Sequence, residues 1–290
     1  MVLSVLDFCN TFEDAAELGP YVESSGYRRY WFAEHPPQPS AEIFVALLSA
    51  MTSRLRVGTG GIALRLRNIS QSACNLQFLD RAFGDRIDMG FCMGGATPEI
   101  EARLAAPHGA PRTMQECDER VDEWISLLRR TPDERVPEIW SLGTSLRSAQ
   151  RAAILGTSYA FSVFHNRSVD DDSVFDVYRA HFRPFFKDST ARTMLAFSGL
   201  CAATDAEAHH QIQAHEATGI RPVIWGSVAT CADRVADLLI RYRPDELLLL
   251  DLSPSVEEKK ASYRRWMDVV ATLSTRARFS ADPPTGGRAR

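Results

Sequence analysis

The feature that most constrains the fold is a regular alternation along the chain. Short apolar runs, rich in β-branched and aromatic residues, are followed by longer stretches with helical periodicity. The short runs predict eight strands, at 2–6, 29–33, 55–59, 87–91, 138–142, 159–163, 193–201 and 246–250. The longer stretches predict helices at 13–25, 41–52, 70–83, 113–130, 146–155, 172–186, 205–217, 230–241 and 256–273. Alternation of this kind predicts an α/β fold with a parallel sheet.

The number of units favours a closed barrel. Residues 247–250 are all leucine, which is typical of a parallel strand covered by helices. Eight β/α units in roughly 250 residues match a single (β/α)8 TIM barrel, the fold we predict. An open, doubly wound sheet is the alternative, because the count alone does not exclude it. We expect one domain over 1–279 and a disordered tail over 280–290, where Pro, Gly and Arg occur without apolar periodicity.

Composition bears on partners and compartment. Acidic residues exceed basic ones by 37 to 33, and the chain lacks the Lys/Arg block typical of nucleic-acid binding. No apolar run approaches the roughly 20 residues of a membrane helix. The first residues lack the basic segment of a signal peptide. The six cysteines are scattered without a CxxC pair, which favours reduced thiols. We therefore expect a cytoplasmic protein without nucleic-acid or membrane partners.

Candidate site residues follow the predicted strands, because active sites of such barrels lie at the C-terminal ends of the strands. The residues found there are Asp7, Glu34-His35, Gly60-Gly61, Cys92, Gly143-Thr144-Ser145, His165, Cys201 and Asp251. His35 is a candidate acid/base, because imidazole titrates near neutral pH; a loop histidine without a catalytic role fits its position equally well. Glu34 points away from His35 on an extended segment, so it would orient the site rather than form a dyad.

A short polar loop before one helix suits a phosphate. Gly143, Thr144 and Ser145, with Ser148 beyond, precede the helix predicted at 146–155. Backbone N–H groups at a helix N-terminus, together with hydroxyls, bind phosphate well. An ordinary helix cap produces the same residue pattern, so the loop alone leaves both readings open.

For each remaining candidate, a purely structural role explains the residue as well as a functional one does. Gly60 and Gly61 permit either a close ligand approach or a simple turn. Cys92 is either a site thiol or an inert buried cysteine. Three histidines lie on a charged predicted helix without the spacing of metal ligands, namely His209, His210 and His215. We predict no metal site.

Several segments, taken in chain order, share a pattern with one family. The run Trp31-Phe32-Ala33-Glu34-His35 resembles the end of that family's second strand, and 52–61 resembles its third strand. The segments 78–90, 139–150, 203–208, 226–235 and 245–250 resemble further blocks in the same order. The family is that of the bacterial luciferase-like flavin-dependent monooxygenases, and the resemblance covers about 2–273.

This resemblance implies a chemistry and roles for named residues. Such enzymes use reduced FMN from a separate flavin reductase, together with O2, to oxygenate a small or carrier-bound substrate through a C4a-peroxyflavin. His35 takes the place of the family's active-site histidine, and Cys92 that of a reactive thiol in the luciferase catalytic subunit. Arg112 falls near the FMN phosphate, where its bidentate geometry is suitable. The resemblance places the cofactor against Glu34, Gly60, Gly61, Arg112, Gly143, Thr144, Ser145 and Ser148. In some members the peptide at the Gly60-Gly61 position is cis.

The chain also departs from the family pattern. Met93 stands where many relatives have an arginine, and Cys74 where luciferase has a glutamate near the flavin. Val163 and Phe164 replace histidines, and the segment 218–225 is short, which implies a more open site. The alternatives are a non-oxygenating flavin-binding relative, an inactive subunit of a heterodimer, or an F420-dependent dehydrogenase on the same barrel. The family's usual pairing predicts a homodimer.

Overall fold

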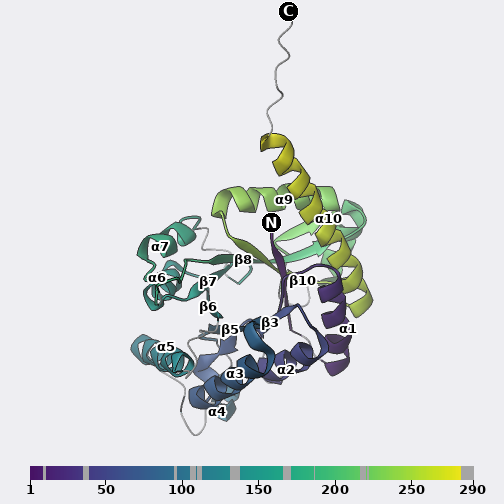
Figure 1. The fold of residues 1–290 in the computed structure, drawn as a ribbon. Helices are drawn as coiled ribbons and strands as arrows, with labels where there is room; N and C mark the ends of the chain where they lie inside the picture. The colour runs from purple at the N-terminus through teal and green to yellow at the C-terminus, as the bar shows by residue number, and fades with distance from the viewer. Residues whose placement is uncertain are drawn as a thin grey trace, which may run out of the picture.

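The computed structural model describes residues 1–8, 11–34, 39–94, 97–104, 109, 113–130, 138–165, 171–185, 187–215, 220 and 222–281. Eight parallel strands form a closed barrel, as predicted. Its strands are β1 Leu3–Asp7, β2 Arg29–Phe32, β3 Arg56–Thr59, β5 Ile87–Cys92, β6 Glu138–Gly143, β7 Ser158–Ser162, β8 Thr193–Cys201 and β10 Glu246–Asp251. Figure 1 shows these strands as an inner ring surrounded by helices.

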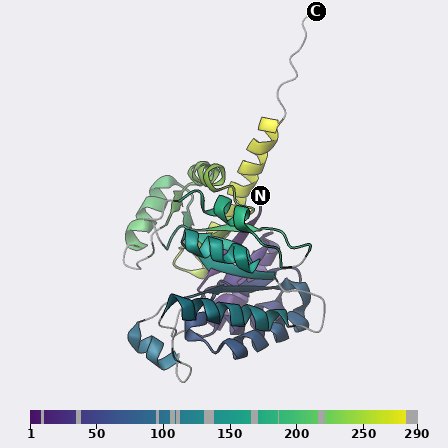
Figure 2. The same cartoon turned by 90° about the vertical axis from the view of Figure 1, so that its left-hand side faces the viewer.

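The helices follow the predicted order and cover the outside of the barrel (Figures 1 and 2). They are α1 Phe12–Ser24, α2 Ala41–Met51, α3 Ile69–Phe83, α5 Met114–Arg129, α6 Leu146–Leu155, α7 Val174–His181, α8 Asp205–His215, α9 Val228–Tyr242 and α10 Val256–Ala281. Side-chain caps and glycines set the ends of several of these helices. Thr113 and Glu116 form a reciprocal capping box at the start of α5. Gly156, at φ 62°, ends α6 in a left-handed conformation that suits glycine.

Strand β10 closes the ring. It pairs in parallel with β1, where Leu247 lies opposite Leu3, and with β8, where Leu249 lies opposite Phe197. Its leucines alternate between two faces, as the pleat requires. Leu247 and Leu249 pack with the helices, whereas Leu248 and Leu250 pack inside the barrel. The continuous apolar run therefore reflects two cores that share one strand.

The core inside the barrel is small and apolar. Its buried members are Leu6, Trp31, Trp140, Ala160, Phe164, Met194, Ala196, Leu248, Leu250 and Leu252. The two tryptophan rings, Trp31 and Trp140, meet edge to face at 5.4 Å, a favourable aromatic geometry. The larger core lies between strands and helices. The lumen is thus a packed interior rather than a pore.

Some elements lie outside the predicted pattern. Two short strands pair beside the barrel strands, β4 Ile62–Ala63 with β5 and β9 Ile224–Gly226 with β8. The short helix α4, Pro98–Leu104, and the 3-10 helices η1, Leu64–Leu66, and η2, Gly84–Arg86, were also not predicted. Helix α10 continues to Ala281, past its predicted end at 273, and projects beyond the ring of helices (Figures 1 and 2). The predicted tail largely lies outside the described residues.

Five cysteines of the described residues carry free thiols, namely Cys74, Cys92, Cys117, Cys201 and Cys231. In the same residues, no helix combines the length and apolar content needed to cross a membrane. No group of three or more His, Cys, Asp or Glu side chains in this part of the chain is placed to hold a metal ion. The ring of His209 packs against Trp225, with centroids 5.8 Å apart.

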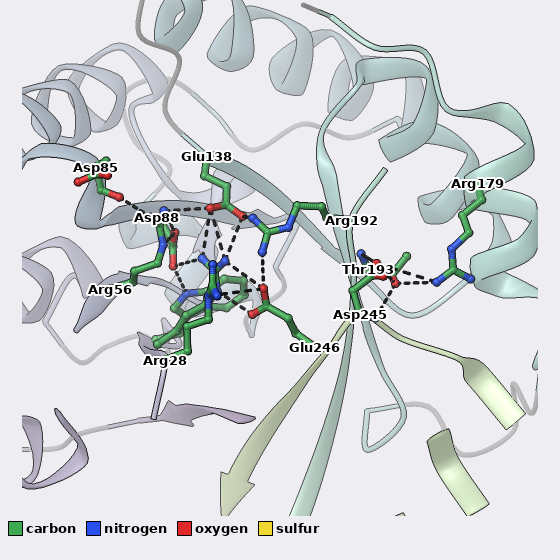
Figure 3. A network of polar contacts seen from close by, with 12 residues as sticks. Arg28, Arg56, Asp85, Asp88, Glu138, Arg179, Arg192, Thr193, Asp245 and Glu246 are labelled. Carbon is green, nitrogen blue, oxygen red and sulfur yellow. Dashed lines mark hydrogen bonds and ion pairs between the residues drawn. The ribbon is translucent and has the colours of Figure 1, made fainter. Parts of the chain in front are cut away.

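A buried ion network fills the N-terminal end of the barrel (Figure 3). Arg29, at the start of β2, is fully buried. Its guanidinium donates to Asp88 of β5 at 2.7 Å and to Glu246 of β10 at 2.8 Å. It also pairs with Glu138 of β6 at 3.2 Å. One guanidinium therefore contacts carboxylates from three strands around the ring.

Further side chains complete this network. Arg56 pairs with Asp88 at 2.5 Å and with Glu138 at 2.9 Å, and Arg192 pairs with Glu138 and Glu246. Trp31 Nε1 donates to Asp88 at 2.9 Å. Burial by itself raises the pKa of Asp88, but the guanidinium groups of Arg29 and Arg56 outweigh it and hold that pKa below its ordinary value.

Neutralising Asp88 should destabilise the fold strongly. Asp88→Asn keeps the size of the side chain but leaves the Arg29 charge buried with one fewer counter-charge, so we expect unfolding to require about 3 kcal/mol less. Urea unfolding at pH 7.5, followed by circular dichroism, measures this. Folding lowers the pKa of Asp88, so its carboxylate stabilises the folded protein at pH values above the pKa that it has in the unfolded chain. This stabilisation is lost as the pH falls through the pKa of Asp88 in the folded protein.

The control for this prediction is Asp118→Asn. Asp118 pairs with Arg147 at 2.6 Å on the surface, and exposed pairs contribute at most about 1 kcal/mol. Equal losses in the two variants would show that the network does not hold the barrel together.

Candidate active site

The third barrel strand bends at its C-terminal end. After Thr59 the Gly60–Gly61 peptide is cis, and the chain resumes as β4, which also pairs with β5. A Cβ at Gly61 would lie 2.8 Å from backbone atoms of Phe91, and one at Gly60 would lie 2.6 Å from Leu6. Both contacts are too close for any larger residue without rearrangement. The pair of glycines is therefore required by the packing of the rim itself.

Glu34 fixes the chain beyond this bend. Its side chain is only 2% exposed. One carboxylate oxygen accepts from the Ala63 backbone N–H at 2.9 Å, and the other pairs with Arg67 at 2.5 Å. Ser40 Oγ donates to the same oxygen at 3.4 Å. Glu34 thus holds the chain after the bend through backbone and arginine contacts that the sequence did not indicate.

Cys92 lies next to this cluster, at the end of β5. Its thiol donates to the Gly61 carbonyl, with Sγ 3.8 Å from the oxygen. Burial, and secondarily the negative charge of Glu34, raise the pKa of Cys92 to about 12. The thiol is therefore neutral near pH 7, which favours a hydrogen-bonding role over a nucleophilic one.

The polar loop lies on the neighbouring strand, β6. Ser145 caps α6 by accepting from the Ser148 backbone N–H at 3.3 Å, and Ser148 Oγ accepts in return from the Ser145 N–H at 3.2 Å. Ser148 Oγ also lies 2.9 Å from the Tyr159 hydroxyl. A Cβ at Gly143 would lie 2.2 Å from Ser148 Oγ. The ordinary cap is thus present, and the half-buried Thr144 and Ser145 lie at the start of α6.

The structure brings most of the predicted residues to one side of the rim. Glu34, Gly60, Gly61 and Cys92 meet at the ends of β2, β3 and β5, and the loop 143–148 follows on β6. His35 and Arg112 lie outside the described residues, so their predicted roles remain predictions.

A cavity of about 340 Å³ opens at another part of the same rim. It lies at the ends of β1 and β10; strand β1 is next to β2 and is four strands from β6 in the order of the ring. Asp7 and Asp251, each the last residue of its strand, line it together with Lys259 of α10. The sequence indicated Asp7 and Asp251 as strand-end residues but gave no sign of Lys259, which comes from a helix more than 250 residues after Asp7.

Fold and site together define the class. The chain is a (β/α)8 barrel whose C-terminal rim carries a glycine bend, a half-buried cysteine and a hydroxyl-lined helix start, beside an apolar lumen. The sequence model of the luciferase-like monooxygenase family matches residues 4–234. The chain belongs to this family.

Curated relatives agree with this assignment. The uncharacterized protein YceB of Bacillus subtilis is 28% identical over 88% of this chain and 92% of its own length. The N-acetyl-S-alkylcysteine monooxygenase of the same organism is 28% identical over 71% of this chain and 67% of its own. Against several other relatives the match spans 63–65% of their length.

Solved structures share the fold. Apo-MsnO8 has a TM-score of 0.80 at 24% identity, covering 93% of this chain and 98% of that one. The FMN complex of the oxygenating constituent of 3,6-diketocamphane monooxygenase from Pseudomonas putida has a TM-score of 0.70 at 14% identity, over 94% and 98%. An F420-dependent secondary alcohol dehydrogenase has a TM-score of 0.69 at 12% identity, and the match also covers 94% of this chain and 98% of that one.

The raised pKa of Cys92 predicts slow alkylation. At pH 7.5 we expect iodoacetamide to modify Cys92 far more slowly than the exposed Cys74, because the thiolate is the reactive form. The rate at Cys92 should still rise with pH above 9, as a pKa of about 12 requires. Peptide mass spectrometry over a time course measures both rates. A rate at Cys92 that levels off below pH 8 would contradict a neutral thiol.

Proposed function

We propose that the protein is a flavin-dependent monooxygenase that uses FMNH2 from a separate reductase, and O2, to oxygenate a small organic or carrier-bound substrate. Membership of the luciferase-like family supports this. The structural observation that carries the proposal is the placement of the glycine bend, Cys92 and the α6 loop on adjacent strand ends of one rim.

The residues of this rim fit FMN. The start of α6 offers backbone N–H groups and the hydroxyls of Thr144 and Ser145, a donor set suited to the phosphate. Gly60 and Gly61 present backbone without side chains, and the lumen beside them is apolar, which suits the flat ring system. Bound in reduced form, FMN would supply the electrons that activate O2.

The protein's own residues then have distinct tasks. Glu34 holds the bend in place through Ala63 and Arg67. Cys92, as a neutral thiol, donates a hydrogen bond at the rim rather than attacking a substrate. Apolar lumen residues such as Trp140 and Phe164 exclude water from the reacting atoms. His35 keeps its predicted role as the group that moves protons.

Two other functions compete with this proposal. A flavin-binding protein without oxygenase activity, including an inactive partner in a heterodimer, would bind FMN but leave its reaction with O2 unchanged. An F420-dependent dehydrogenase would bind the deazaflavin in preference to FMN. Flavin-binding preference separates the second of these from an oxygenase, and a single kinetic experiment separates the first.

That experiment is stopped-flow absorbance of flavin reoxidation. Anaerobic protein with reduced FMN is mixed with oxygenated buffer, and we expect reoxidation about tenfold slower than for free FMN, a change of about 1.4 kcal/mol in barrier. His35→Ala should return the rate toward that of free FMN, because a proton-transfer group is lost. Reoxidation like that of free FMN, despite tight binding, would favour the non-oxygenating alternative.

Riboflavin, which lacks the phosphate, is the matched probe for the cofactor site. FMN should bind more tightly than riboflavin, and Ser145→Ala should reduce that difference by removing one hydroxyl from the loop. Equal binding of both flavins would remove the phosphate site from the proposal, and tighter binding of F420 would favour the dehydrogenase.

We also propose a homodimer formed through α2 and α3, the pairing that the family resemblance implies. Two large apolar side chains on these helices are well exposed, Ile43 at 62% and Phe78 at 65%. Helices α2 and α3 are neighbours on the barrel, so both side chains belong to one side of the molecule. Large exposed apolar side chains on neighbouring helices would suit such an interface.

A charge introduced at this surface should break the dimer. Ile43→Glu and Phe78→Glu together are expected to give a monomer by light scattering after gel filtration, because a carboxylate would be buried without a partner. Ile240→Glu on α9 is the control, since Ile240 is 76% exposed on another helix. A monomeric unmodified protein, or a dimer that survives the double change, would contradict this arrangement.

A further inference from the structure

The cavity at the ends of β1 and β10 is lined by apolar residues, here called the apolar wall, and by polar residues, here called the polar wall. The apolar wall consists of Phe8, Leu18, Ile220, Leu250, Leu252 and Val256. The polar wall consists of Asp7, Asp14, Asp251, Ser253, Ser255 and Lys259. A volume of about 340 Å³ falls in the range of small-molecule sites, which are mostly apolar with a few placed polar groups.

The buried charges of the polar wall are held by the protein itself. Asp7 accepts from Lys259 at 2.6 Å and from the Tyr30 hydroxyl at 3.0 Å, so this pair of charges balances. Asp251 accepts from the Ser253 N–H at 2.9 Å and from Trp266 Nε1 at 3.2 Å. These bonds fix the shape of the cavity and keep Lys259 engaged with Asp7.

Asp14 differs from the other two carboxylates. It lies half-buried in the first turn of α1 and lines the cavity. Within the described ranges, its side chain enters no ion pair or hydrogen bond that ties it to another element. Asp251 adds little to this, because burial raises its pKa and its oxygens already accept from Ser253, Ser262 and Trp266. With Lys259 balanced by Asp7, Asp14 leaves this wall with one uncompensated negative charge and free hydrogen-bond acceptors.

The position of the cavity connects it with the proposed chemistry. It lies across the mouth from the α6 loop, and Leu250 and Leu252 belong both to its wall and to the apolar core of the lumen. A molecule held there would extend its apolar part over the lumen, toward the rim where FMN is proposed to bind.

We propose that this cavity binds the organic substrate, and that the substrate is an amphipathic amine whose ammonium group pairs with Asp14 while its apolar part lies against Leu250 and Leu252. An ammonium supplies the positive charge and the N–H donors that the Asp14 carboxylate can accept. A carboxylate would be repelled by Asp14. This inference rests on the proposed function for the fate of the substrate, but the binding itself does not require flavin.

The test compares three probes of equal chain length on the full-length protein without flavin. Hexylammonium, 1-hexanol and hexanoate are titrated at pH 7.5, and affinity is measured by saturation-transfer NMR. We expect hexylammonium to bind about fivefold more tightly than 1-hexanol, the range of a partly exposed ion pair, and hexanoate to bind most weakly.

Two variants locate the binding. Asp14→Asn should remove the preference for hexylammonium while leaving 1-hexanol nearly unchanged. Asp85→Asn removes the same charge at the opposite end of the barrel, where Asp85 lies in η2, and should change neither probe. Val256→Phe should weaken all three probes by filling the cavity, with its circular dichroism spectrum checked against the unmodified protein.

Several results would overturn the inference. Equal affinity for the three probes would refute the ligand class, and binding that persists unchanged in Asp14→Asn and Val256→Phe would place the probes elsewhere. Absence of binding by any probe would refute the site. FMN titration of the same samples separates these outcomes from a failure of the proposed function, because flavin binding is expected whatever happens in this cavity.

Discussion

Closure of the barrel depends on a positive charge buried at its N-terminal end. The Arg29 guanidinium of β2 contacts carboxylates that start β6 and β10 and one near the start of β5. Since a buried charge is tolerated only with partners close by, these four strands are held at fixed positions around the ring. The ion network fills the N-terminal end of the lumen, and an apolar core lies above it, toward the C-terminal rim. Stability and candidate chemistry therefore occupy opposite ends, as is usual for this fold.

The barrel could be predicted because each of its strands carries its own signal. The run at 246–250, for instance, is apolar throughout because its alternate leucines face two cores. The short strands β4 and β9 have two and three residues, too few to show any periodicity. The ion network was also beyond prediction, because Arg29, Asp88 and Glu246 are far apart in sequence and only the closed ring brings them together.

The candidate site was predictable to the extent that it depends on position along a strand. Strand ends gave Glu34, Cys92 and the loop from Gly143 to Ser148, because parallel strands bring all their C-terminal ends to one rim. The contacts of those residues were not predictable. Arg67 reaches Glu34 from a segment that follows the glycine bend, and no local pattern marks this pairing. The state of Cys92 likewise depends on burial and on a neighbouring charge, neither of which a motif contains.

The double pairing of β10 has a consequence for how the chain reaches its native state. Strand β10 bonds to β1, near the start of the chain, and to β8, so the ring cannot close until almost the whole sequence is available. Contacts between such distant segments form slowly, because a large loop must be ordered before they stabilise anything. Until then β1 and β8 each present an open edge, with unpaired N–H and C=O groups able to bond to other chains. Before β10 pairs, the partly folded chain can therefore associate with other chains through these edges. Once β10 pairs with β1 and β8, the barrel has no open edge.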